Sequence, residues 1–343
     1  MWQELHELPE ELLDLEAGML AAHLEKPTLV HLPGRQPEPL FVSLLLHGNE
    51  YVGWDAVRDL LADYHARGRE LPRALSLFIG NVRAAAEGRR TLDGQPDFNR
   101  VWPGTETPRA PEARMMAEIV ERMHELGVFA SVDLHNNTGL NPHYACVNVL
   151  RQAHLHLATL FSRTVVYFVR PVGVQSMAFS ELCPAVTLEC GKVGDEGGLR
   201  HARDFIDACL HLTGFPSHPV PREDIDLFHT VATVKVPPNC RFSFHGEPAA
   251  MQFVPDLERL NFSELPPGTA FALVDDGCRL DVVDEQGRPV FDEFFRIEEG
   301  RLLLTQAAMP AMLTSNEAVV RQDCLCYLME RHPYPPPSDE RNE

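Results

Sequence analysis

Residues 39–50 read PLFVSLLLHGNE, an apolar run that ends in a histidine and a glutamate. Apolar runs without polar alternation are typical of strands buried on both faces, as in a parallel sheet. Apolar residues with helical spacing follow directly over residues 51–66. The sequence therefore predicts a strand, a polar turn at the carboxyl end of that strand, and a helix.

The same order of elements recurs along the chain. Further strands are predicted at residues 75–79, 128–134, 165–169 and 185–188, and further helices at 111–126, 151–163 and 198–213. Residues 80–107 are rich in Gly, Pro, Asn and Arg and are predicted to be mostly loop. Strands that alternate with helices predict an α/β fold with a mostly parallel (mixed) sheet and helices on both faces.

The chain divides into three predicted segments. Residues 1–225 form the larger domain, with a helical extension at residues 1–25, where leucines recur among acidic residues. Residues 226–332 carry short β-like runs between prolines and glycines, which predicts a small C-terminal β domain. Residues 333–343 contain four prolines and several charges, and they predict a disordered tail.

Composition narrows the function. The 343 residues are 44% hydrophobic and 23% charged, enough for a full core. The formal net charge of −20 repels phosphate backbones and anionic lipid, which argues against nucleic-acid binding and membrane attachment. The sequence contains no run of 18 or more apolar residues, so no membrane span is predicted. The acidic start is unlike a leader sequence, so a cytoplasmic protein is expected, and a homo-oligomer stays open.

The cysteines show no motif. None of them forms a C-x-x-C pair, and the chain is long for a disulfide-stapled protein. We therefore predict reduced and mostly buried thiols at all eight positions: Cys146, Cys183, Cys190, Cys209, Cys240, Cys278, Cys324 and Cys326.

Two strand ends carry residues that bind metal ions. His47 and Glu50 follow the first strand, and the run VDLH places His135 at the end of another. Carboxyl ends of strands in open α/β sheets form ligand sites, so these three side chains are predicted to bind one Zn²⁺ with a fourth position open for water. Asp133 shares a strand face with His135 and is predicted to orient an imidazole. Taken alone, either block also fits ordinary strand-end histidines.

Three further blocks add groups for acid–base chemistry and anion binding. Glu189 ends another apolar run and could take a proton from a metal-bound water. Arg90 lies in an arginine-rich loop and could stabilise a developing oxyanion. Asn99 and Arg100 could hold a carboxylate.

Five blocks in this order, HGNE, GNV…GRR, DFNR, DLHNNTG and TLECGK, span residues 47–192. Together they resemble the succinylglutamate desuccinylase/aspartoacylase family of zinc hydrolases, which is related in fold to the zinc carboxypeptidases. The resemblance implies a zinc carboxypeptidase-like catalytic domain, one Zn²⁺ per chain and a small-molecule N-acyl amino acid as substrate.

The resemblance also implies a role for each candidate residue. These are zinc ligands His47, Glu50 and His135, general base and acid Glu189, carbonyl-polarising Arg90, and carboxylate-binding Asn99 and Arg100. Whether Arg89 or Arg90 faces the site stays open. Aspartoacylases carry an Arg and a Tyr shortly before the catalytic Glu, whereas residues 175–179 (QSMAF) contain no Arg, which counts against N-acetylaspartate as substrate.

The favoured prediction is an amidohydrolase that removes the acyl group from an N-acyl amino acid, with metal-bound water attacking the amide and Glu189 as general base. Two alternatives stay open. A zinc carboxypeptidase acting on a peptide or a cell-wall peptide would use the same metal and base with a different pocket. A binding protein that kept the fold would show no metal-dependent hydrolysis.

Overall fold

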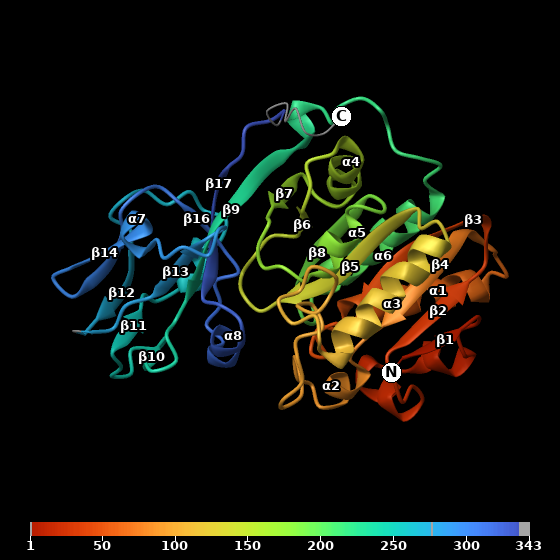
Figure 1. Cartoon of the computed structure of the whole chain (residues 1–343), viewed down its shortest axis with the longest axis horizontal. Helices are drawn as coiled ribbons and strands as arrows, with labels where there is room; N and C mark the ends of the chain where they lie inside the picture. Colours follow the sequence, from red (N-terminus) through yellow and green to blue (C-terminus); the bar gives the residue numbers. More distant parts are fainter. Residues whose placement is uncertain (1, 276, 336–343) are drawn as a thin grey trace.

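The computed structural model describes residues 2–275 and 277–335. Within these residues, one mixed sheet of twelve strands runs through the molecule (Figure 1). Its strands in sheet order are β1 (Gln3–Leu5), β2 (Thr28–Leu32), β4 (Leu71–Ile79), β3 (Gly34–Leu44), β5 (Ala130–Asn137), β8 (Ala185–Lys192), β6 (Tyr144–Val147), β7 (Thr164–Tyr167), β9 (Asp226–Lys235), β17 (Cys326–Arg331) and β16 (Met309–Ala311), with β13 (Asp281–Asp284) paired to β9. The central strands β4, β3, β5 and β8 are parallel.

Helices cover both faces of this sheet. Those on one face are α1 (Val52–Ala66), α4 (Gln152–Phe161) and α6 (Glu196–His211), and those on the other are α3 (Pro111–Glu125) and α5 (Gln175–Phe179). Side chains of β3 alternate accordingly, because Val42 joins the core beneath α1 and Phe41 joins the core beneath α3. The predicted fold class is confirmed.

The elements predicted between residues 39 and 213 all form, with bounds that differ by a few residues. The expected helix over residues 1–25 does not form as one element: this segment holds β1 and two 3-10 helices, η1 (Glu10–Asp14) and η2 (Ala17–Ala22). Residues 3–5 pair with β2, and Pro9 stands just before η1, so a continuous helix is interrupted. The expected loop at 80–107 contains the short helix α2 (Val82–Ala86).

Beyond residue 225 the chain extends the large sheet and also builds a second one. Strands β9, β13, β16 and β17 belong to the large sheet. The large sheet therefore continues past residue 225, where the sequence predicts a boundary between two domains. The second sheet, at the left of Figure 1, consists of β10 (Phe242–Ser243), β11 (Met251–Phe253), β12 (Ala270–Val274), β15 (Arg301–Leu304) and β14 (Phe295–Glu298). The short helix η3 (Arg222–Asp224) precedes β9, and α8 (Glu317–Gln322) lies between β16 and β17. The short helices η4 (Leu257–Leu260) and α7 (Phe291–Phe294) lie between strands of the second sheet.

The predicted disordered tail, residues 333–343, lies mostly outside the described residues. Within its described part, the Tyr334 hydroxyl donates a hydrogen bond to the Val220 carbonyl at 2.8 Å. Tyr334 also packs against the main core. The beginning of this segment is therefore attached to the fold.

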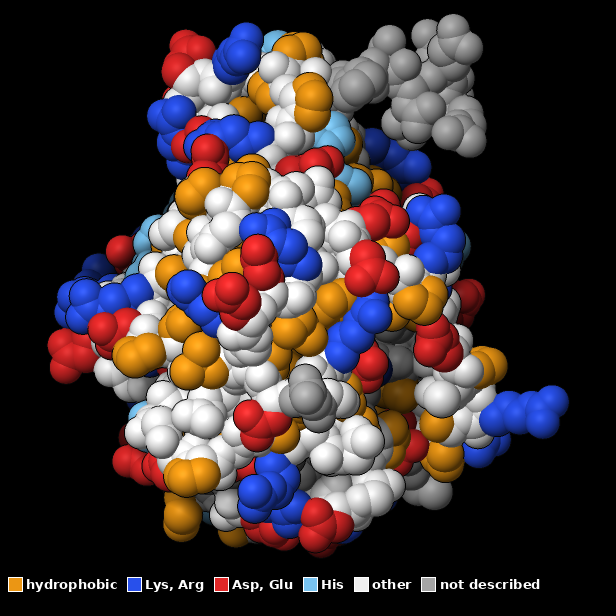
Figure 2. All heavy atoms as spheres, turned by 90° about the vertical axis from the view of Figure 1, so that its left-hand side faces the viewer, with side chains coloured by type: hydrophobic (Ala, Val, Ile, Leu, Met, Phe, Trp, Pro, Cys, Tyr) orange, Lys and Arg blue, Asp and Glu red, His pale blue; other side chains and the backbone are white. Residues whose placement is uncertain are grey.

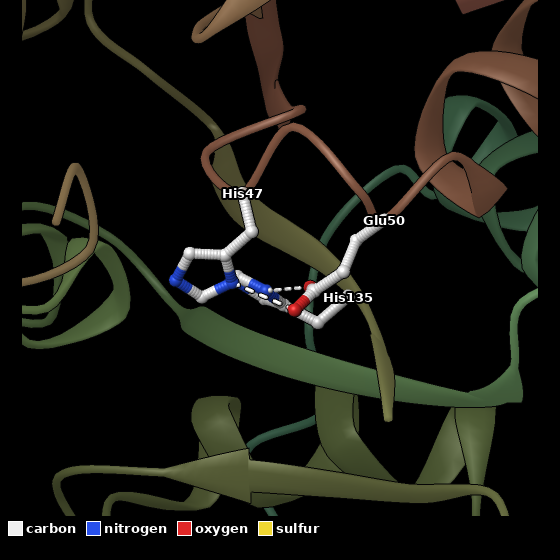
Figure 3. Close-up of side chains that lie close together, drawn as sticks. All are labelled: His47, Glu50 and His135. Atoms are coloured by element: carbon white, nitrogen blue, oxygen red, sulfur yellow. Dashed lines mark hydrogen bonds and ion pairs between the residues drawn. The ribbon is translucent and has the colours of Figure 1, made fainter. Parts of the chain in front are cut away.

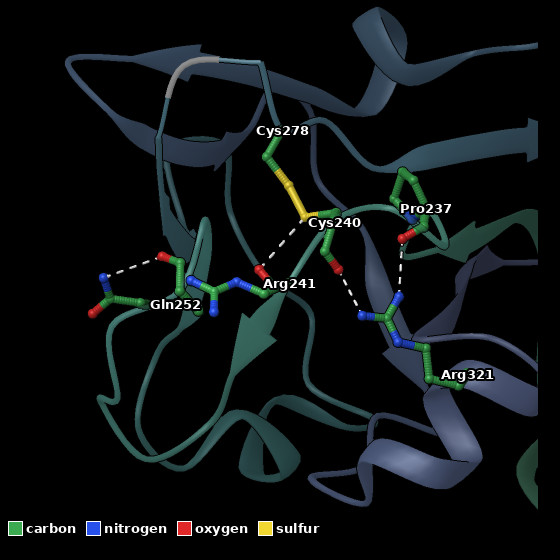
Figure 4. The surroundings of a disulfide bond; sticks show 7 residues. Pro237, Cys240, Arg241, Gln252, Cys278 and Arg321 are labelled. Atoms are coloured by element: carbon green, nitrogen blue, oxygen red, sulfur yellow. Dashed lines mark hydrogen bonds between the residues drawn. A yellow bond between two sulfur atoms is a disulfide. The ribbon is translucent and has the colours of Figure 1, made fainter.

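A disulfide joins Cys240 to Cys278 in the C-terminal β region, contrary to the prediction of free thiols at all eight positions (Figure 4). The two Cα atoms lie 6.0 Å apart although 38 residues separate them in sequence. Local spacing carries no signal for such a pair, because only the fold brings the two residues together. Arg321 donates hydrogen bonds to the carbonyls of Pro237 and Cys240, at 2.9 and 2.6 Å. The other six cysteines, all within the described residues, are free and buried.

We expect protein purified without reductant to show six reactive thiols after denaturation and eight after reduction. Closing a loop of this length stabilises a fold by about 2–4 kcal/mol, so replacing both Cys240 and Cys278 with Ser lowers the free energy of unfolding by that amount. Thiol titration and urea unfolding measure the two effects. Eight reactive thiols before reduction would contradict the assignment.

The surface beside the second sheet is mixed in character. Figure 2 shows acidic, basic and hydrophobic side chains interspersed over this face, and no one class dominates it.

Among the described residues, no helix combines the length and the apolar character that a membrane span requires.

Candidate metal centre and active site

The turn after β3 presents His47 and Glu50. Leu45 adopts a left-handed φ of 54°, so the backbone leaves the sheet just after the strand ends. Gly48 packs directly against α2, where a Cβ atom would lie 2.3 Å from the Ala84 carbonyl carbon. Only glycine fits at that position, and the turn is held between the sheet and α2.

His135 reaches the same place from the neighbouring strand. Its parent strand β5 runs parallel to β3, so the two carboxyl ends meet. Nδ1 of His47 lies 2.8 Å from one oxygen of Glu50, and Nδ1 of His135 lies 2.7 Å from the other. Figure 3 shows the three side chains turned toward one another. Their candidate ligand atoms all lie within 4.8 Å of one another.

The outer nitrogens of the two imidazoles contact carboxylates. Nε2 of His47 lies 3.0 Å from Asp97, and Nε2 of His135 lies 2.7 Å from Asp133. A carboxylate at Nε2 holds the proton on that nitrogen, which leaves Nδ1 free to bind a cation. The sequence predicts such a contact for Asp133, whereas Asp97 lies in the DFNR block without a predicted role.

This donor set fits a divalent metal ion. Two imidazole nitrogens and a carboxylate are ligands that Zn²⁺ binds in catalytic sites. The three residues are buried, at 4–8% exposure, so a cation there would be shielded from bulk solvent. The structure thus brings His47, Glu50 and His135 together as a group able to hold a metal ion.

Glu189 stands beside this triad on β8. It is the residue paired with His135 across the two parallel strands, and residues paired in this way project from the same sheet face. Its side chain is buried, and its Oε2 atom has no hydrogen-bond partner among the described residues. Burial raises the pKa of Glu189 to about 7, and the nearby Glu50 carboxylate adds to the effect. A buried carboxylate with an unused oxygen is suited to exchange protons.

Of the two adjacent arginines, Arg90 faces the cavity. Its Nε and Nη2 atoms donate to one oxygen of Asp97, at 3.1 and 2.9 Å. Its Nη1 atom lies 3.6 Å from Glu50. Arg89 points outward and pairs with Asp93. Of Arg89 and Arg90, between which the sequence does not choose, it is Arg90 that lines the cavity.

Arg100 is bound by a carboxylate from far along the chain. Asp323 follows α8, and both of its oxygens accept hydrogen bonds from Nη2 of Arg100, at 3.1 and 3.2 Å. The same carboxylate lies 3.4 Å from Nη2 of Arg90. Asp323 carries no local sequence signal, because 223 residues separate it from Arg100.

Asn99 supports the metal-binding side of the site. Its Nδ2 atom donates to Asp133 at 3.0 Å, and its Oδ1 atom accepts from the Gln175 backbone N–H at 2.9 Å. The side chain is 5% exposed and has a protein partner at each end. A contact between Asn99 and substrate stays a prediction.

Residues 175–179, which contain no arginine, form α5, and Gln175, Ser176 and Phe179 of this helix are buried. The Gln175 side chain donates to the Ser131 hydroxyl at 2.6 Å and is fully buried. Phe179 stacks on Phe41, with ring centroids 4.5 Å apart. This segment therefore packs in the core, and its link to the site is the Gln175 backbone N–H that donates to Asn99.

Comparison with known proteins assigns the family. Residues 40–211, half of the chain, match the family model of the succinylglutamate desuccinylase/aspartoacylase catalytic domain. The chain belongs to this family. The family takes its name from hydrolases that remove acyl groups from amino acids, and the candidate site lies within the matched residues.

Solved structures of this fold include members of the succinylglutamate desuccinylase/aspartoacylase family. Succinylglutamate desuccinylase from Chromobacterium violaceum is 20% identical, with 88% of this chain and 87% of that chain covered and a TM-score of 0.58. A succinylglutamate desuccinylase/aspartoacylase from Rhodobacter sphaeroides is 16% identical, with 89% of each covered and a TM-score of 0.55.

Murine aminoacylase 3 is also similar in structure. It is 16% identical, with 87% of this chain and 96% of that chain covered and a TM-score of 0.55. At such identities these likenesses show the fold. A search by sequence among proteins of curated function gives no match.

Proposed function

We propose that the protein is a zinc-dependent amidohydrolase that removes the acyl group from an N-acyl amino acid, with one Zn²⁺ per chain. The arrangement of His47, Glu50 and His135 beside Glu189 supports this most strongly. A metal-binding triad and a carboxylate with a free oxygen are the parts that hydrolysis of an amide by water requires. Membership of the family supports the same class of reaction.

Each group in the site has a separate role in the proposed reaction. A bound Zn²⁺ would supply Lewis-acid chemistry, lowering the pKa of water and polarising the amide carbonyl. Glu189 accepts the proton of the attacking water and passes it to the leaving nitrogen. Arg90 stabilises negative charge as it develops on the carbonyl oxygen. The buried surroundings strengthen each of these electrostatic interactions.

In the proposed reaction, substrate is bound on the side of the cavity that Arg100 lines. Arg100 presents a guanidinium group held in place by Asp323 and by the Asn99 carbonyl. We propose that Arg100 positions the amino-acid carboxylate so that the amide lies against the triad and Glu189. A fixed carboxylate would restrict the orientation of the amide, which lowers the entropic cost of reaction.

The test is release of free amine from a panel of N-acyl amino acids by protein loaded with Zn²⁺. We expect hydrolysis that a chelator abolishes and that added Zn²⁺ restores. Dipeptides with a free C-terminus form the comparison set. Metal-dependent cleavage of dipeptides with no cleavage of N-acyl amino acids would favour the carboxypeptidase alternative, and metal binding without any hydrolysis would favour a binding protein.

A further inference from the structure

The cavity beside Glu189 continues over an apolar part of the large sheet. Its wall includes Tyr144 and Cys146 from β6, Val166 from β7 and Met329 from β17. Each of these residues is at most 8% exposed. Tyr144, Cys146, Val166 and Met329, here called the apolar wall, also belong to one hydrophobic cluster.

The register of the strands places the apolar wall on the same sheet face as Glu189. Tyr144 is paired with Glu189, and Cys146 is paired with Val166. Val166 is in turn paired with Phe228 of β9, which belongs to the same cluster. Because paired residues project from one face, the apolar surface begins at the catalytic carboxylate and runs across β6 and β7 to β9.

The guanidinium groups that line this cavity already have protein partners. Within the part of the chain that the structure describes, they belong to Arg90, Arg100 and Arg170. Asp97 and Asp323 offset the charges of Arg90 and Arg100. Arg170 donates from Nε to the Glu285 carbonyl at 2.6 Å, and its Nη1 atom pairs with the Glu106 carboxylate at 3.3 Å. The proposed function assigns Arg100, despite its contact with Asp323, to the amino-acid carboxylate, which leaves only Arg90 and Arg170 for a second carboxylate. Arg90 already contacts Asp97, Asp323 and Glu50, so a second carboxylate would be buried without a cation of its own, which is strongly unfavourable.

From this wall and this charge balance, and resting on the proposed function, we infer that the substrate carries a single carboxylate and is otherwise apolar. The carboxylate lies at Arg100, and an aromatic or aliphatic group lies on the apolar wall. N-acyl amino acids with a second carboxylate, on the acyl group or on the side chain, are excluded by the same surface.

The wild-type protein tests this inference with four substrates. N-acetylphenylalanine places an apolar group on the amino-acid side and N-benzoylglycine places one on the acyl side, while N-acetylaspartate and N-succinylglutamate carry additional carboxylates. We expect kcat/KM for the better apolar substrate to exceed that for either acidic substrate by about 100-fold or more. An acidic substrate hydrolysed as well as the apolar ones would overturn the inference.

A binding measurement separates this inference from the proposed reaction. Zn²⁺-loaded Glu189→Gln protein is titrated calorimetrically with N-acetylphenylalanine and with N-acetylaspartate. Tighter binding of the apolar compound supports the inference even if the wild type hydrolyses nothing, in which case only the proposed reaction fails. Tighter binding of N-acetylaspartate overturns the inference whether or not hydrolysis occurs.

A matched pair of variants tests the apolar wall itself. Val166→Phe fills the part of the cavity next to the apolar wall, so a large side chain no longer fits there. We therefore expect the ratio of kcat/KM for N-acetylphenylalanine to that for N-acetylglycine to fall by about 10-fold or more. Val193→Phe, the same change at an exposed turn, leaves that ratio unchanged. A ratio unaltered in folded Val166→Phe protein would show that substrate does not touch the wall. If that variant does not fold, the wild-type panel decides.

Discussion

Glu189→Gln protein should bind Zn²⁺ normally and lose about 10²–10⁴-fold in kcat. The substitution keeps the size of the side chain and removes its ability to accept a proton, and general base catalysis contributes about that factor. Glu189 is not one of the three clustered ligands, so the metal content should stay near one per chain. Metal analysis and steady-state kinetics on the same preparation measure the two quantities.

The matched control for this substitution is Glu181→Gln. Glu181 lies eight positions earlier, is exposed and pairs with Arg151 at the surface. Its replacement should change neither metal content nor kcat. If Glu189→Gln instead loses metal while activity per bound metal stays normal, Glu189 is a ligand and the proposed proton transfer is wrong.

The triad could be predicted because each member stands at the end of an apolar strand. In a parallel sheet the carboxyl ends of neighbouring strands meet at one edge. The order of apolar runs and helices was therefore enough to place His47 and Glu50 near His135. The alternation of side chains on β5 likewise put Asp133 on the face of His135.

The contacts that could not be predicted join segments far apart in the chain. Asp323 reaches Arg100 only because β17 lies in the large sheet, and that sheet continues past the expected boundary at residue 225. The disulfide between Cys240 and Cys278 depends in the same way on the second sheet. Neither pair has a characteristic spacing, and only the three-dimensional fold brings the partners together.

The contact between Asp97 and His47 could not be predicted for a different reason. The DFNR block drew attention to its asparagine and arginine as anion binders, because those side chains recognise carboxylates. In the structure the aspartate of the same block contacts His47 at 3.0 Å and also accepts from Arg90. Side-chain type showed that the block is polar, but not which of its members faces the metal-binding residues.

Asp97→Asn and Asp133→Asn should each weaken Zn²⁺ binding by about 10- to 100-fold, and the double variant by about 10²–10⁴-fold if the two effects are independent. Each carboxylate holds the proton on Nε2 of one histidine, at 3.0 Å for His47 and 2.7 Å for His135. An amide in its place carries no charge to stabilise that proton, so Nδ1 is a weaker and less well-oriented ligand. Competition with a chromogenic chelator measures the affinity directly, without any substrate.

Asp195→Asn is the matched control, because Asp195 pairs with His143 at 3.2 Å and neither residue belongs to the triad. This aspartate also accepts a hydrogen bond from the Gly197 N–H at the start of α6, a contact that asparagine preserves. Zn²⁺ affinity should therefore equal that of the wild type. Asp195 is exposed, so an equal loss of affinity in Asp195→Asn would mean that the loss does not depend on contact with the histidines of the triad. Unchanged affinity in Asp97→Asn and Asp133→Asn would mean that the imidazoles are oriented by packing alone, and the two carboxylates would then need another role in the site.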